Sequence, residues 1–104
     1  MTEDLRTRPV FTLSVAAELL KVHPRTLMFY EKEHLIEPAR TKTGRRLFSR
    51  ADLSLLQFIR YLIEKKRLNT AGVRMLLELL TKLKSSNPNL KKEYFADFEE
   101  KQLI

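Results

Sequence analysis

The stretch that decides the fold runs from residue 13 to residue 33 and reads LSVAAELLKVHPRTLMFYEKE. Its apolar residues recur at the spacing of one helical face, which predicts a first helix over residues 13–21. His23-Pro24 opens a second helix over residues 24–33, because proline at the first helical position has no N–H that needs a partner. Since only two or three residues separate the helices, the pattern is typical of a helix-turn-helix.

A small hairpin is expected next, over residues 39–48. Pro38 biases the residue before it away from the helix, and Gly44 supplies a turn between two short extended flanks. No acid occurs between residues 40 and 50, whereas the basic side chains there are Arg40, Lys42, Arg45, Arg46 and Arg50. Such a cluster repels itself without a polyanion, so it predicts a wing that grips DNA; the alternative is a solvated surface.

Two further helices complete the expected domain. Ser49 and Asp52 form a near capping box for a third helix, which ends at the basic residues 65–67. Asn69 or Thr70 caps a fourth helix, whose apolar stripe consists of Val73, Leu76, Leu77, Leu80 and Leu83. The predicted fold class is mainly α: a winged helix-turn-helix with a small β-hairpin wing, plus a short C-terminal helix.

The chain is expected to have a flexible lead-in (1–10), a winged helix-turn-helix DNA-binding domain (11–84) and a short amphipathic tail (85–104). A segment as short as the tail is marginal as an isolated helix, so it must pack on something. It either folds back onto its own core or forms a dimer or partner contact. The candidate dimer or partner contacts are Leu76, Leu80, Leu83, Tyr94, Phe95 and Phe98.

Composition narrows the function classes. The 104 residues include 20 Lys and Arg against 13 Asp and Glu, a formal net charge of +7, with the excess in residues 1–84. This balance favours a nucleic-acid partner. Without cysteine and with only two histidines, we expect no metal site, and the absence of disulfides favours the cytoplasm. We expect no cofactor, no catalytic residues and no enzyme activity, and no apolar run is long enough to span a membrane.

Base contacts are expected from the N-terminal part of the second helix, because a helix in the major groove reads base edges there. Arg25 can pair with guanine, and Thr26 can meet a thymine methyl group. Tyr30 can donate to a phosphate or pack in the core, and both can hold at once.

The order of these motifs resembles the MerR family of transcriptional regulators. The resemblance covers about residues 10–84 and rests on His23-Pro-Arg-Thr-Leu-Met-Phe-Tyr-Glu31, Leu35-Ile-Glu-Pro-Ala-Arg40 and Gly44-Arg-Arg-Leu-Phe-Ser49. It implies recognition-helix contacts from Arg25, Thr26, Phe29 and Tyr30, and wing contacts from Arg40, Lys42, Arg45 and Arg46. The family often has Arg where this chain has Met28, Tyr where it has Phe29 and Phe48, and Gly where it has His34.

The family implies a homodimer that binds inverted repeats in double-stranded DNA near promoters. Residues 67–74 look most like the heat-shock repressor branch, the HspR-like proteins, and the glutamine-regulator branch is second. The first branch implies repression of chaperone genes, with an Hsp70-type chaperone as partner. The rival hypotheses are an architectural DNA-bending protein of the excisionase kind, and a protein-interaction adaptor that acts through its tail.

Overall fold

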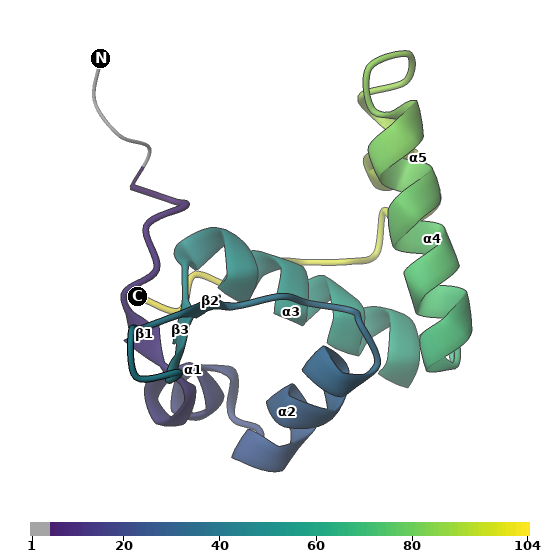
Figure 1. The fold of residues 1–104 in the computed structure, drawn as a ribbon. Helices are drawn as coiled ribbons and strands as arrows, with labels where there is room; N and C mark the ends of the chain where they lie inside the picture. The colour runs from purple at the N-terminus through teal and green to yellow at the C-terminus, as the bar shows by residue number, and fades with distance from the viewer. Residues whose placement is uncertain (1–4) are drawn as a thin grey trace.

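The computed structural model describes residues 5–104, and Figure 1 shows a small sheet at one side of the molecule and helices over the rest. Within these residues the helices are α1 (Leu13–Leu20), α2 (Pro24–Lys32), α3 (Arg50–Glu64), α4 (Thr70–Leu83) and α5 (Leu90–Tyr94). The strands are β1 (Phe11–Thr12), β2 (Ala39–Arg40) and β3 (Arg46–Phe48). The predicted fold class is confirmed, with helix ends within a residue or two of the expected ones.

The turn between α1 and α2 is closed by a left-handed residue and a histidine cap. Lys21 has φ of 58°, and the amide of Val22 donates to the Ala17 carbonyl at 3.0 Å, which is a Schellman ending. The Nδ1 atom of His23 then accepts from the Arg25 amide at 3.0 Å and caps α2. His34 has φ of 62° and ends α2 in the same way.

The wing is a three-stranded antiparallel sheet rather than a hairpin alone. The strand order is β1-β3-β2, so β3 is central, with Phe11 opposite Phe48 and Arg40 opposite Arg46. The turn places Gly44 at φ of 87°. The sequence pattern did not predict β1, since two residues show no periodicity. The flexible lead-in over residues 1–10 stays a prediction, and its first four residues lie outside the described part of the chain.

The core forms around α3, which buries more side chains than any other element among residues 5–104. A capping box starts it, in which Ser49 and Asp52 each accept from the other's backbone amide. Its buried residues are Leu53, Leu56, Phe58, Ile59, Tyr61 and Leu62. Leu27 of α2 and the fully buried Phe48 of β3 belong to the same core cluster. The helix-turn-helix and the wing are therefore held on one core.

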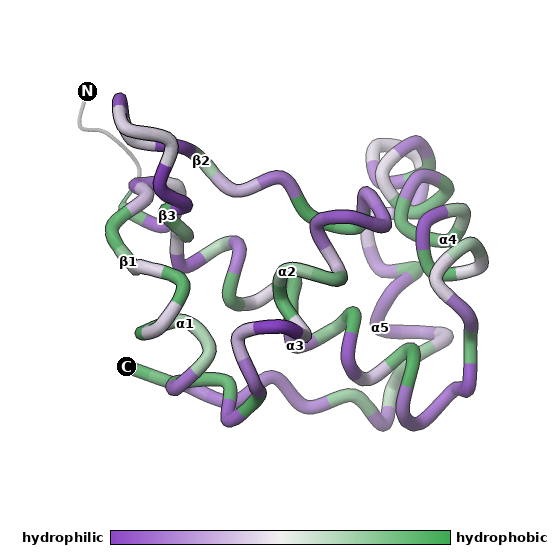
Figure 2. Tube along the Cα trace, turned by 60° about the horizontal axis from the view of Figure 1, so that its bottom comes forward, coloured by the Kyte–Doolittle hydropathy of each residue, from purple (hydrophilic) through white to green (hydrophobic). Residues whose placement is uncertain are grey.

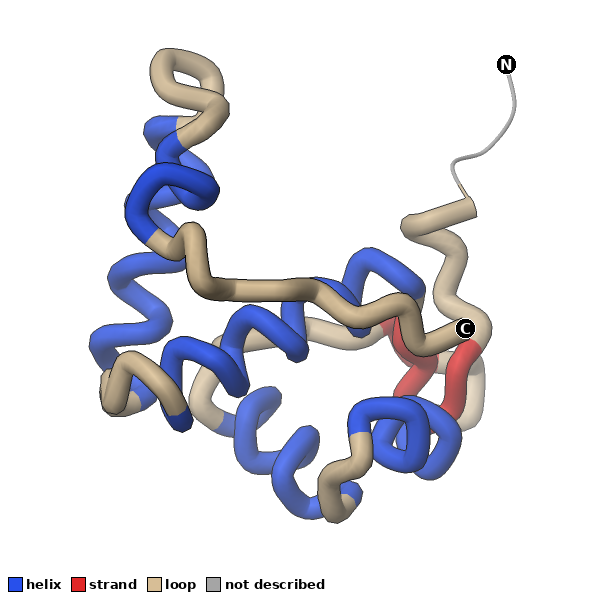
Figure 3. Tube along the Cα trace, turned by 180° about the vertical axis from the view of Figure 1, so that it is seen from behind, coloured by secondary structure: helices blue, strands red, loops and turns tan. Residues whose placement is uncertain are grey.

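The fourth helix begins at Asn69, whose side chain accepts from the Gly72 amide at 2.8 Å. After α5 the chain turns back and runs along α3 toward the strands, as seen from behind in Figure 3. The side chain of Gln57 bonds both backbone groups of Lys101, at 3.0 Å and 2.8 Å. No helix in the described residues is long and apolar enough to cross a membrane.

Candidate nucleic-acid interface

The outward face of α2 carries two cations and two apolar side chains and no acid. Arg25, Met28, Phe29 and Lys32 are exposed and recur at helical spacing. Phe29 is 48% exposed and Met28 is 40% exposed, whereas the neighbouring Leu27 is buried in the core. A surface helix gains nothing from exposing such side chains to water, whereas base edges and thymine methyl groups accept them. This face suits a DNA groove.

Among the candidates on α2, Arg25 and Phe29 lie on this outward face, and Thr26 is half-buried at its edge. Tyr30 differs, because only 5% of its surface is exposed and it packs in the core. Burial raises the pKa of the Tyr30 phenol, against the nearby charge of Arg60. Of the two interpretations of Tyr30, the structure supports packing in the core. Lys32 is a cation on the outward face that the sequence pattern did not single out.

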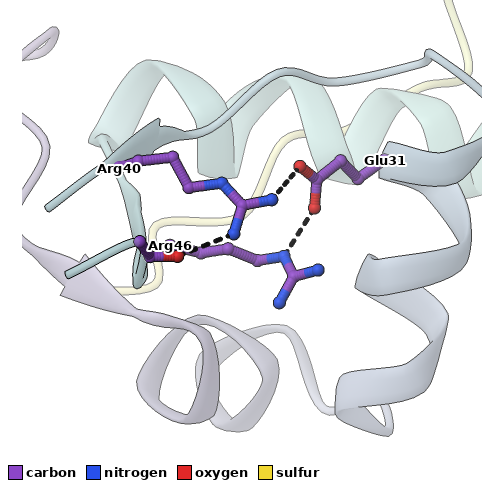
Figure 4. A network of polar contacts seen from close by, with 4 residues as sticks. Glu31, Arg40 and Arg46 are labelled. Carbon is purple, nitrogen blue, oxygen red and sulfur yellow. Dashed lines mark hydrogen bonds and ion pairs between the residues drawn. The ribbon is translucent and has the colours of Figure 1, made fainter.

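One carboxylate joins the wing to α2 (Figure 4). Glu31 accepts from Arg40 Nη2 at 2.6 Å and from Arg46 Nε at 2.5 Å, so its two oxygens each hold one wing arginine. Arg40 Nη1 also donates to the carbonyl of Gly44 at 2.9 Å, across the turn of the wing. We call Glu31 with Arg40 and Arg46 the Glu31 clamp. It fixes the position of the wing relative to α2.

The clamp changes the charge at this surface. Burial opposes ionisation of Glu31, but the hydrogen bonds and charges of Arg46 and Arg40 outweigh it and hold the pKa of the carboxyl below its ordinary value. The expectation that the wing cations have no acid nearby is therefore wrong. Residues 31, 40 and 46 are too far apart in sequence for a local pattern to reveal the pairing. Arg40 and Arg46 position the wing, whatever else they contact.

Two wing cations point into solvent. Lys42 and Arg45 are exposed at the turn, and no ion pair within residues 5–104 involves either of them. The turn itself is closed by the amide of Gly44, which donates to the Thr41 carbonyl at 2.9 Å. Together with Arg25 and Lys32 these side chains give the α2 and wing surface a surplus of positive charge, which a phosphate backbone would neutralise.

The C-terminal end of α2 is anchored to α4. Arg74 Nη1 donates to the backbone carbonyl of Glu33 at 2.5 Å, and Thr70 Oγ1 donates to the Glu33 carboxylate at 2.8 Å. Both donors come from the first turns of α4, so a shift of α4 would move or break these contacts at the end of α2. The sequence pattern did not predict this junction.

The residues predicted as dimer or partner contacts lie in two settings, packed partly against the core or exposed. Leu76 and Leu80 pack partly against the core, whereas Leu83 of the same helix is 37% exposed. Met75 and Leu79 lie on the same side as Leu83 and are 71% and 51% exposed. Figure 2 shows hydrophobic stretches recurring along α4. The outward stripe of α4 is therefore Met75, Leu79 and Leu83, of which the sequence analysis named one.

The aromatic residues of the tail also divide into packed and exposed ones. Phe95 and Phe98 lie 5.4 Å and 5.2 Å from the Phe58 ring of α3, measured between centroids. The hydroxyl of Tyr61 donates to Asp97 beside them. Tyr94 is 72% exposed. In this chain Phe95 and Phe98 thus fold back onto α3, and Tyr94 is left at the surface. Their role as dimer or partner contacts stays a prediction.

Among residues 5–104, no three His, Cys, Asp or Glu side chains come together as metal ligands would. His23 is used as a helix cap, and His34 is a turn residue with positive φ.

Comparison with known proteins agrees with this geometry. A family model described as MerR HTH family regulatory protein matches residues 11–80. A protein named heat shock protein HspR from Streptomyces coelicolor is 38% identical over 79 residues, which are 76% of this chain and 50% of that protein. The HTH-type transcriptional regulator GlnR from Bacillus anthracis is 38% identical over 77 residues, 74% of this chain and 59% of that regulator. The chain thus spans only half to three-fifths of these relatives.

Proposed function

Because this chain belongs to the MerR family of helix-turn-helix regulatory proteins, we propose that it is a transcriptional regulator that binds duplex DNA. The observation that carries the proposal is the acid-free outward face of α2, held beside a basic wing by the Glu31 clamp. A helix fits the major groove, and a wing fits the adjacent backbone or minor groove.

The two parts of the surface have separate tasks. Arg25, in the first turn of α2, discriminates one base pair, and Phe29 meets an apolar base edge such as a thymine methyl group. Lys42 and Arg45 of the wing contact phosphates and carry no sequence information. Arg40 and Arg46 position the wing relative to α2, because both bind the Glu31 carboxylate, which also neutralises part of their charge.

A second copy of the chain completes the regulator. Met75, Leu79 and Leu83 leave a stripe of apolar surface on α4, and an isologous contact through it buries the same stripe on both copies. A two-fold dimer places two α2 helices on an inverted repeat. The proposed regulator is a repressor of stress or chaperone genes with an Hsp70-type chaperone as partner, which rests on the likeness to the protein named heat shock protein HspR.

Paired alanine variants test the division of tasks by fluorescence anisotropy with specific and random duplexes. Arg25→Ala should cost about 1–3 kcal/mol on the specific site only and relax discrimination at one base pair. Arg45→Ala should weaken both duplexes alike and reduce the salt slope by about one. Lys92→Ala removes an exposed cation from α5 and is the matched control. If Arg25→Ala and Arg45→Ala changed both duplexes in the same way, the division would be refuted.

A further inference from the structure

A cleft lies between α3 and α4, where the chain turns from α4 into α5. Its volume is about 790 Å³, within the range of pockets that hold small molecules. Its apolar lining comes from α3, α4, α5 and the segment after α2, namely Leu35, Leu55, Phe58, Leu77, Leu80 and Leu90. Neither the DNA surface nor the outward stripe of α4 accounts for this cleft.

The charged groups of the cleft are mostly cations. Arg74, Lys82, Lys84 and Lys91 line it, against the single carboxylate of Glu78. Among residues 5–104, none of these four cations forms an ion pair. An apolar pocket lined by unpaired cations is complementary to a molecule with an apolar body and a negative group.

Lys91 shows how this complementarity acts. Its ammonium lies 4.2 Å from the centroid of the Phe58 ring and 5.3 Å from that of Phe98. Desolvation by burial lowers the pKa of this ammonium, with Glu100 opposing the shift and Lys84 adding to it. The charge is thus held over two aromatic rings at the edge of the cleft, on a side chain that is exposed to solvent. A carboxylate placed there would stabilise it.

We propose that the α3–α4 cleft binds a small amphipathic anion, a carboxylate attached to an apolar chain or ring. The apolar body lies against the leucines and Phe58, and the carboxylate lies beside Lys84 and Lys91. A single-chain carboxylate of about twelve carbons is smaller than the cleft of about 790 Å³ and can enter it.

The cleft is coupled to α2 through Arg74. This residue lines the cleft and also donates to the Glu33 carbonyl, directly after α2. His34 and Leu35, the next two residues, line the cleft as well. The apolar body of a bound anion packs against Arg74 and Leu35 and so disturbs the anchor of α2. This coupling rests on the DNA-binding function proposed above, and it predicts that the anion weakens DNA binding and DNA weakens anion binding by the same factor.

Titration of the full chain with dodecanoate, below its micelle concentration, tests the site without DNA. Calorimetry gives the affinity, and backbone amide NMR shifts locate the site. Dodecyltrimethylammonium has a similar chain with the opposite charge and should bind far more weakly. Thr81 lines the cleft at the surface, so Thr81→Phe should obstruct its opening and abolish binding, whereas Thr81→Ala should leave binding intact. Lys91→Gln should weaken binding roughly two- to fivefold, and Lys92→Gln on the same short helix should not.

Each outcome decides one part of the proposal. Equal binding of the two amphiphiles, or binding that survives Thr81→Phe in a folded protein, would overturn the site. Amide shifts confined to α2 and the wing would overturn it as well. If dodecanoate binds in the cleft but leaves duplex affinity unchanged, the coupling through Arg74 is wrong. Failure to bind any duplex in the absence of dodecanoate would instead refute the proposed function and leave the binding result standing.

Discussion

Replacing Glu31 with glutamine tests whether charge holds the wing on α2. The change preserves the size of the side chain but removes the carboxylate that accepts from Arg40 at 2.6 Å and from Arg46 at 2.5 Å. The two contacts differ in exposure, since the Arg46 side chain is 24% exposed and that of Arg40 is 43% exposed. Most of the effect should therefore come from Arg46.

A charge-assisted hydrogen bond at a part-buried site contributes about 1.5–3 kcal/mol. The contact with Arg40 adds at most about 1 kcal/mol, because solvent screens it. Glutamine retains one amide oxygen as an acceptor, so Glu31→Gln should lower the free energy of unfolding by about 1–3 kcal/mol. For a domain of this size, the melting temperature should fall by about 4–12 °C.

Urea unfolding followed by circular dichroism measures this loss in a double-mutant cycle. Glu31→Gln and Arg46→Gln should be non-additive, with a coupling energy of about 1 kcal/mol or more. Arg45→Gln is the control, because it removes a neighbouring exposed cation and should change stability by less than about 0.5 kcal/mol. A coupling energy near zero, or an equal loss in Arg45→Gln, would refute the clamp.

Three further outcomes are expected. The folded pKa of Glu31 lies below its unfolded value, so the stabilisation is present above the unfolded pKa of about 4.3 and is lost as pH falls through the folded pKa. Urea unfolding between neutral and acid pH should show wild type losing its stability advantage over Glu31→Gln in that range. A constant difference in stability between the two proteins would contradict this. Gly44→Ala should cost about 1–2 kcal/mol at φ of 87°, seen as a lower urea midpoint. Phe98→Ala should cost about 1–3 kcal/mol and speed amide exchange in α3, whereas the exposed Tyr94→Ala should do neither.

Local patterns predicted the helices and caps of this fold well, because each depends on neighbours in sequence. His23 at the start of α2 and the capping box at Ser49 are both decided by a few adjacent residues. The left-handed Lys21 and the strand β1 were not predicted. Lysine has no special preference for that conformation, and a two-residue strand exists only because β3 pairs with it.

The location of the candidate site was predictable from the sequence, but the ion pairs that hold it together were less so. Basic residues in the wing and Arg25 at the start of α2 are visible in the sequence, but the partner of Arg40 and Arg46 lies on another element. The side of α4 that faces outward was also hidden, because leucines occur on more than one of its faces. Met75 and Leu79 are exposed, and only the packing of α4 on α3 decides this.

Selection of bound sequences from a random duplex pool, at about physiological salt, tests most directly whether α2 and the wing form a sequence-specific DNA interface. We predict an enriched inverted repeat, bound roughly a thousandfold or more tightly than random DNA, with the preference at one base pair of each half-site relaxed in Arg25→Ala. No enrichment, with weak binding that disappears as salt rises, would contradict it and leave only a non-specific basic surface.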